Sequence, residues 1–203
     1  VVNSIVGHIF RPTVFPKLEL KNGIPPEMST MVIMPTLLPN EKRTKELLDQ
    51  LEIFYLANKE KNLFFALVGD YKDAAQEELP EDGKIKAAAL DKVNELNRRY
   101  AHNGKDIFFY FHRHRQFNSS QGRWMGWERK RGAIIEFNEL LRGNKDTSYS
   151  ILSTDLSEIP YIKCVITLDA DTNLPMGAAR RLIGTMAHPL NRAVVDTATG
   201  TVK

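Results

Sequence analysis

Apolar runs of strand-like length alternate with amphipathic segments along most of this chain. Four runs are rich in Val, Ile, Leu, Phe and Tyr and predict buried β-strands: residues 30–36, 62–70, 106–113 and 161–169. Three segments between them carry apolar side chains at helical spacing: residues 40–58, 83–102 and 126–143. This order predicts right-handed βαβ units and a mostly parallel, Rossmann-like α/β sheet with flanking helices.

The first 26 residues differ from this alternating part, because Pro and polar residues interrupt them. We interpret residues 1–26 as an extended connector and residues 27–203 as one domain. The formal net charge of +3 does not by itself require a nucleic-acid partner. No apolar run reaches 18 residues and no leader pattern begins the chain, so we expect it to be soluble. Because the sequence opens without Met, we also expect it to be a piece of a longer protein.

Acidic side chains follow two of the predicted strands. Asp169 and Asp171 end the run in "CVITLDADTNLP", and Asp70 ends "NLFFALVGD". In a parallel sheet the carboxyl ends of the strands are where ligands bind. Two carboxylates at this spacing suit Mg²⁺ or Mn²⁺ held together with nucleotide phosphates, because these ions prefer hard oxygen ligands and keep positions open. An isolated pair of this kind can also simply end a strand and cap the next helix.

Two other uses of closely spaced aspartates fit the neighbouring residues less well. A calcium-binding EF-hand loop requires Gly and Glu where this chain has Leu174 and Arg180. A dehalogenase-type phosphotransferase motif follows the first strand of its fold, whereas Asp169 ends the fourth predicted strand, and Asn173 stands where Thr or Val is required. We therefore favour the divalent-metal interpretation.

Other polar residues at predicted strand ends and helix starts extend the candidate site. Thr36 stands at the end of the first strand, where a base or ribose can rest, and Asp70 can accept a hydrogen bond from an imide N–H such as that of uracil. Taken singly, Thr36 can also mark a simple strand end next to Pro35, and Asp70 can be an ordinary loop residue. "WERKRG" places Lys130 and Arg131 in the first turns of a helix, where the dipole disfavours cations. A pyrophosphate partner and a solvated basic face explain this placement equally well. We interpret His112 as a loop or surface residue and assign no metal to it.

Three ordered segments resemble the glycosyltransferase domain of the cyclic β-1,2-glucan synthases, which are large bacterial membrane proteins. They are "GIPPEMSTMVIMPTLL", "GRWMGWERKRGAIIEFNELLRG" and "ITLDADTNLPMGAARRLIGTMAHPLNR". The resemblance implies the donor-binding half of a GT-A fold and inverting transfer from UDP-glucose, at the cytoplasmic side of the bacterial inner membrane. It also implies that Asp169 and Asp171 hold the metal and donor. By the same resemblance, Asp70 contacts uracil, and Lys130 and Arg131 lie near the donor.

The chain departs from that family pattern at its end. Only 32 residues follow Asp171, whereas the acceptor half and its catalytic base are expected downstream. Asp196 is not expected to be the base, because it lies at the turn of a predicted hairpin. We therefore predict a donor-binding fragment with no catalytic residue, whose glucan acceptor and membrane contacts belong to missing parts of the parent. The alternative is a non-catalytic nucleic-acid-binding α/β module that uses the basic stretch 98–131.

Overall fold

The computed structural model describes residues 14–101 and 104–202. Within these ranges, one sheet has the strand order β6-β3-β2-β1-β7, and every neighbouring pair is parallel except β3 and β6. Its strands are β1 (Thr30–Leu37), β2 (Leu63–Asp70), β3 (Phe108–Arg113), β6 (Tyr149–Leu152) and β7 (Cys164–Thr167). A separate hairpin pairs β4 (Gln116–Asn118) with β5 (Arg123–Met125). The helices are α2 (Glu41–Ala57), α3 (Asp82–Tyr100), α4 (Arg129–Leu141) and α5 (Ala178–Ala187), with short 3₁₀ helices at Pro26–Met28, Leu156–Glu158 and Pro189–Asn191.

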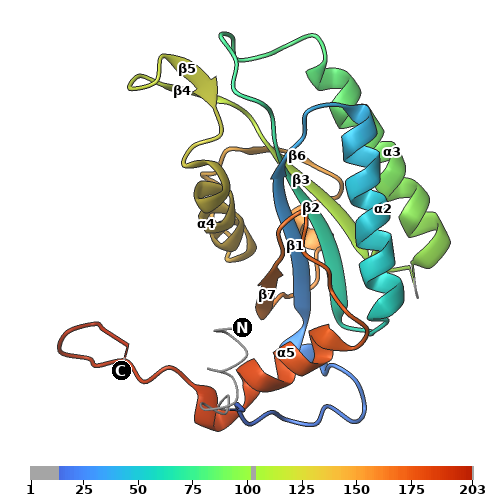
Figure 1. The fold of residues 1–203 in the computed structure, drawn as a ribbon, viewed down its shortest axis with the longest axis vertical. Coiled ribbons are helices and arrows are strands. Elements are labelled where there is room, and N and C mark those ends of the chain that lie inside the picture. The colour runs from blue at the N-terminus through green and yellow to red at the C-terminus, as the bar shows by residue number, and fades with distance from the viewer. Residues whose placement is uncertain (1–13, 102–103, 203) are drawn as a thin grey trace, which may run out of the picture.

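Helices cover both faces of this sheet, with α2 and α3 on one side and α4 on the other (Figure 1). In β1, Val32 and Met34 belong to the apolar layer beneath α2 and α3, whereas Met31 and Ile33 belong to the layer beneath α4. A strand that is buried on both faces must be apolar at nearly every position. This explains why the central strands are uninterrupted apolar runs, and it confirms the predicted Rossmann-like α/β class.

Pro35 lies inside β1, although proline has no backbone N–H to donate. Backbone groups of β1 point alternately to β2 and β7, and Thr30 N donates to Asn62 O on the β2 side. The oxygen of Ile33 accepts from Leu168 N, so Ile33 and Pro35 face the β7 side. Pairing with β7 ends at Ile33. The backbone nitrogen of Pro35, which has no N–H to donate, therefore faces a side where β1 has no paired strand at this position, and no hydrogen bond of the sheet is lost.

The separation of β1 from β7 after Ile33 makes room beyond the carboxyl ends of the strands. After β1, the chain adds β2 and β3 on one side of β1, whereas the later strand β7 pairs with β1 on its other side. In α/β sheets, such a reversal of strand order is the usual position of a ligand site.

The N-terminal end of the described chain lies near α5, whereas the chain after α5 extends away from the sheet to the C-terminus (Figure 1). Residues 14–25 form no helix or strand, and Leu18 N donates to Gly184 O at 3.0 Å. Residues 1–13 of the predicted connector lie outside the described residues. The boundary of the connector at residue 26 stays a prediction. The predicted terminal hairpin is present as one antiparallel bridge between Val195 and Val202. Across the described ranges, no helix is both long enough and apolar enough to cross a membrane.

Candidate functional site

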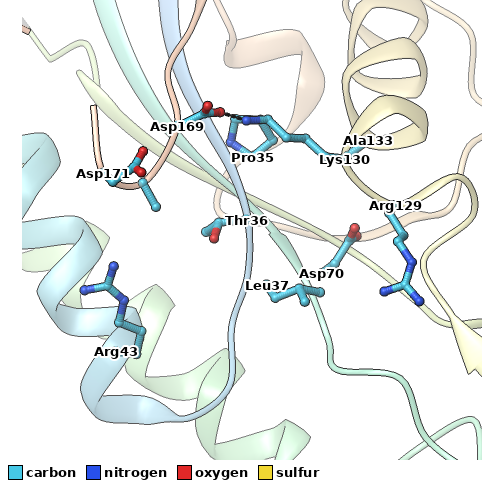
Figure 2. Close-up of a pocket in the computed structure, with 11 residues that line it drawn as sticks. Pro35, Thr36, Leu37, Arg43, Asp70, Arg129, Lys130, Ala133, Asp169 and Asp171 are labelled. Carbon is cyan, nitrogen blue, oxygen red and sulfur yellow. Dashed lines mark ion pairs between the residues drawn. The ribbon is translucent and has the colours of Figure 1, made fainter. Parts of the chain in front are cut away.

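A cavity of about 530 Å³ opens at the carboxyl ends of β1 and β2 (Figure 2). This volume lies within the usual range for small-molecule sites. Four segments supply the predicted site residues: Thr36 from β1, Asp70 from β2, Lys130 from α4, and Asp169 and Asp171 from the loop after β7. The full lining comprises Pro35, Thr36, Leu37, Arg43, Asp70, Arg129, Lys130, Ala133, Asp169, Ala170 and Asp171. Thus five of the six predicted residues meet in one cavity, and Arg131 is the exception.

The carboxylates of Asp169 and Asp171 are accessible from the cavity. Asp169 forms an ion pair with Lys130, and their side chains are 60% and 44% exposed. Asp171 is exposed. No group of three or more His, Cys, Asp or Glu side chains in the described ranges is arranged to hold a metal ion. An ion bound here would thus have at most two carboxylate ligands, which fits Mg²⁺ or Mn²⁺ because such ions complete their coordination with water and phosphate oxygens.

The carboxylate of Asp70 lies on the floor of the cavity and is held by Arg113. Arg113 Nε donates to Oδ1 at 2.7 Å, and Nη2 donates to Oδ2 at 2.6 Å. Burial raises the pKa of Asp70, and the charge-assisted bonds from Arg113 oppose that shift. Each carboxylate oxygen can accept a second hydrogen bond. Asp70 therefore keeps acceptor capacity for a ligand while its orientation is fixed.

Cations border this cavity on two helices. On α4, Arg129 pairs with Asp73 at 2.7 Å, whereas Arg131 pairs with Glu128 at 3.0 Å and its side chain is 76% exposed. On α2, Arg43 also lines the cavity, opposite Arg129 in Figure 2. Arg43 was not among the predicted site residues, although it has the same sequence signal as Lys130, namely a cation in the first turn of a helix that follows a strand.

His112 is buried in β3 and is not a surface residue, so that interpretation is wrong. Its side chain is 0% exposed, and its ring lies 3.8 Å from the ring of Tyr71. The Tyr110 hydroxyl contacts Nδ1, and Nε2 has no hydrogen-bond partner in the described part of the chain. Burial lowers the pKa of His112 to about 3, which keeps the imidazole neutral near pH 7. His112 does not line the cavity at the carboxyl ends of β1 and β2.

Fold and cavity together define a Rossmann-like α/β domain with acids and cations gathered at its strand ends. No protein-family model matches the chain. It is similar to the cyclic beta-(1,2)-glucan synthase NdvB of Rhizobium meliloti (strain 1021), with 39% identity over 197 residues. The matched region is 97% of this chain but only 7% of that relative. This similarity confirms the predicted resemblance to the cyclic β-1,2-glucan synthases.

Proposed function

We propose that this chain is the donor-binding part of a metal-dependent, inverting glucosyltransferase of GT-A type, which uses UDP-glucose to build β-1,2-glucan. The supporting observation is that Asp169, Asp171 and Lys130 face one cavity at the strand ends, in a chain that is similar to a glucan synthase. A diphosphate needs both a metal site and a cation, and this cavity offers candidates for each. By the same resemblance, the parent enzyme would hold the domain at the cytoplasmic side of the inner membrane.

In this proposal, the cavity residues contact different parts of the donor. Asp169 and Asp171 would hold Mg²⁺ or Mn²⁺, an ion that neutralises the diphosphate leaving group when bound. Lys130 donates to a phosphate oxygen, Asp70 accepts the uracil imide proton, and Thr36 contacts the base or ribose. Arg131 is the less well placed of the two predicted cations, because it pairs with Glu128 outside the cavity.

Pairing of the basic residues argues against the nucleic-acid alternative. Arg113 and Arg115 are buried in ion pairs. The ion pairs of Arg99, Arg129, Lys130 and Arg131 are exposed, so it is the buried pair Arg113 and Arg115 that interrupts the basic stretch 98–131. Phosphate binding by a nucleic-acid protein requires cations that are accessible along one surface. The donor-binding function is therefore better supported.

Calorimetric titration of UDP-glucose tests this function. We expect saturable binding in the presence of Mn²⁺ and a large loss of affinity after chelation with EDTA. Binding that is equally strong without the ion would contradict the metal assignment, and absence of binding under both conditions would contradict the donor-binding function. A parallel titration with a single-stranded oligonucleotide at two salt concentrations tests the alternative, because nucleic-acid binding through phosphates weakens steeply with salt.

A further inference from the structure

Arg113 uses every N–H group of its guanidinium at the edge of this cavity. Its side chain is 0% exposed at the end of β3. Two donors bind the carboxylate of Asp70, and a third binds Glu136 Oε1 at 3.1 Å. The other two bind the main-chain oxygens of Trp127 and Arg129, each at 2.9 Å. A guanidinium has five N–H donors, so its capacity is fully used.

The two main-chain oxygens belong to the tight turn that begins α4. Glu128 and Arg129 in this turn have φ values of 50° and 48°, which are uncommon for residues other than Gly. Such a conformation persists only where the surroundings impose it. The bonds from Arg113 reach the carbonyls of Trp127 and Arg129, on either side of Glu128. Arg113 thus holds the turn in this conformation.

The same turn lies directly against the ion pair between Arg113 and Asp70. A methyl group added at Gly126 would lie 2.7 Å from Arg113 Nη2 and 2.8 Å from Asp70 Oδ2. Arg129, in this turn, and Lys130, the next residue, both line the cavity. One buried guanidinium therefore sets the position of the acid on the cavity floor and of the cations at its rim.

We infer that Arg113 is a positioning residue that couples selection of the base by Asp70 to diphosphate binding by the cations of α4. This inference rests on the proposed function. Arg113 itself does not line the cavity, so it acts through the groups that it holds. Lysine cannot replace it, because an ammonium is a point charge with three donors and lacks the planar fork that binds a carboxylate in two places.

Arg115 provides a matched control on the same segment. It is also buried, and it donates to both carboxylate oxygens of Asp82 at 2.5 and 3.0 Å. Its other bonds reach the main-chain oxygens of Lys72 and Glu77, at 2.7 and 2.8 Å. None of these partners lines the proposed donor cavity. Arg115→Lys should therefore disturb the fold in a similar way without moving the proposed donor contacts.

The test compares the affinities of UDP and CDP for Arg113→Lys, Arg115→Lys and the unaltered chain, with Mn²⁺ present. Cytosine has no imide N–H, so the ratio of the two affinities reports on Asp70. Partial unfolding weakens the apparent binding of every nucleotide by the same factor and leaves this ratio unchanged. We expect Arg113→Lys to lower the ratio by about tenfold or more and to weaken pyrophosphate binding, whereas Arg115→Lys preserves the ratio.

An unchanged ratio and unchanged pyrophosphate affinity in Arg113→Lys would overturn the inference while leaving the proposed function intact. Failure of the unaltered chain to bind UDP would overturn both. Should Arg113→Lys not fold, Gly126→Ala takes its place, because it presses on the ion pair and removes no donor. Its control is Gly83→Ala, where an added methyl meets nothing within 4 Å. The inference is supported if the preference for UDP over CDP is lost in Gly126→Ala and kept in Gly83→Ala. It is overturned if the two variants show the same preference.

Discussion

The ammonium of Lys130 contacts the carboxylate of Asp169, and this ion pair joins the first turn of α4 to the loop after β7 (Figure 2). A cation at the start of a helix is unfavourable because of the helix dipole, and the carboxylate offsets that cost. In the proposed donor complex each group has another partner, since Asp169 holds the metal ion and Lys130 binds phosphate. The ion pair must then open or rearrange when donor binds.

Lys130→Met tests this competition. Because the ion pair is exposed, its opening costs little, about 0–1 kcal/mol, so we expect Mn²⁺ alone to bind the variant up to about fivefold more tightly. UDP binding at saturating Mn²⁺ should weaken by about tenfold, because a charge-assisted bond to phosphate is lost. Calorimetry measures both.

Arg131→Met identifies which cation contacts the donor. We expect it to weaken UDP binding less than Lys130→Met does, and the reverse order would favour Arg131.

Asp171 is the second proposed metal ligand. Replacement by Asn keeps the size of the side chain and removes its charge, so we expect Asp171→Asn to weaken Mn²⁺-dependent UDP binding by about 1–3 kcal/mol, or roughly fivefold to 150-fold. Asp91→Asn, on the exposed face of α3, is the matched control. If both variants bind UDP as the unaltered chain does, Asp171 is not a ligand.

The buried imidazole of His112 should make folding stability depend on pH. Its pKa is lowered to about 3 in the folded chain, against about 6.5 when unfolded. Between these values the unfolded chain binds more protons, so stability is greatest above pH 6.5 and falls as the pH decreases toward 3. The expected loss from this group is about 2 kcal/mol at pH 5, since each unit is about 1.4 kcal/mol.

Urea unfolding at pH 7 and pH 5 measures this effect. His112→Phe removes the titrating group from the core, so we expect the difference in stability between the two pH values to shrink. His114→Phe, at a half-buried position two residues along, should keep the difference. If His112→Phe retains the full pH dependence, other groups cause it.

Much of this fold follows from the periodicity of the sequence. β1 and β2 are predictable because burial on both faces requires uninterrupted apolar runs. β6 was missed because its apolar residues form a run of only four positions, Tyr149–Leu152, interrupted by Ser150. The hairpin of β4 and β5 was missed for a similar reason, since its three-residue strands form outside the main sheet.

The candidate site was predictable only in part. Asp70, Asp169 and Lys130 lie at strand ends or helix starts, where a mostly parallel topology brings residues distant in sequence together. Arg113 also ends a predicted strand, but that position does not reveal its role, which depends on the turn at Glu128 and on a partner 43 residues earlier in the chain. The ion pair of Lys130 with Asp169 depends on how closely α4 approaches the loop after β7. Periodicity does not specify that approach.

No carboxylate that lines the described cavity is left to act as the catalytic base of a transfer. Transfer requires a base within hydrogen-bond reach of the acceptor hydroxyl. Among the described residues that line the cavity, the carboxylates are those of Asp70, Asp169 and Asp171, and each has a proposed partner in the donor complex. Asp196 lies in the terminal hairpin and does not line this cavity. We therefore expect the 203-residue chain to bind UDP-glucose without lengthening a glucan.

Incubation with UDP-glucose, Mn²⁺ and a β-1,2-linked oligosaccharide, followed by mass spectrometry of the products, tests this expectation. Orientation of an acceptor against the sugar carbon supplies roughly 7–11 kcal/mol of barrier reduction, so its absence should remove nearly all transfer and not merely a modest fraction. Slow release of free glucose is expected, because water can replace the acceptor. Elongation at an enzymatic rate would show that a base lies within this chain, and loss of that rate in Asp196→Asn would then identify it.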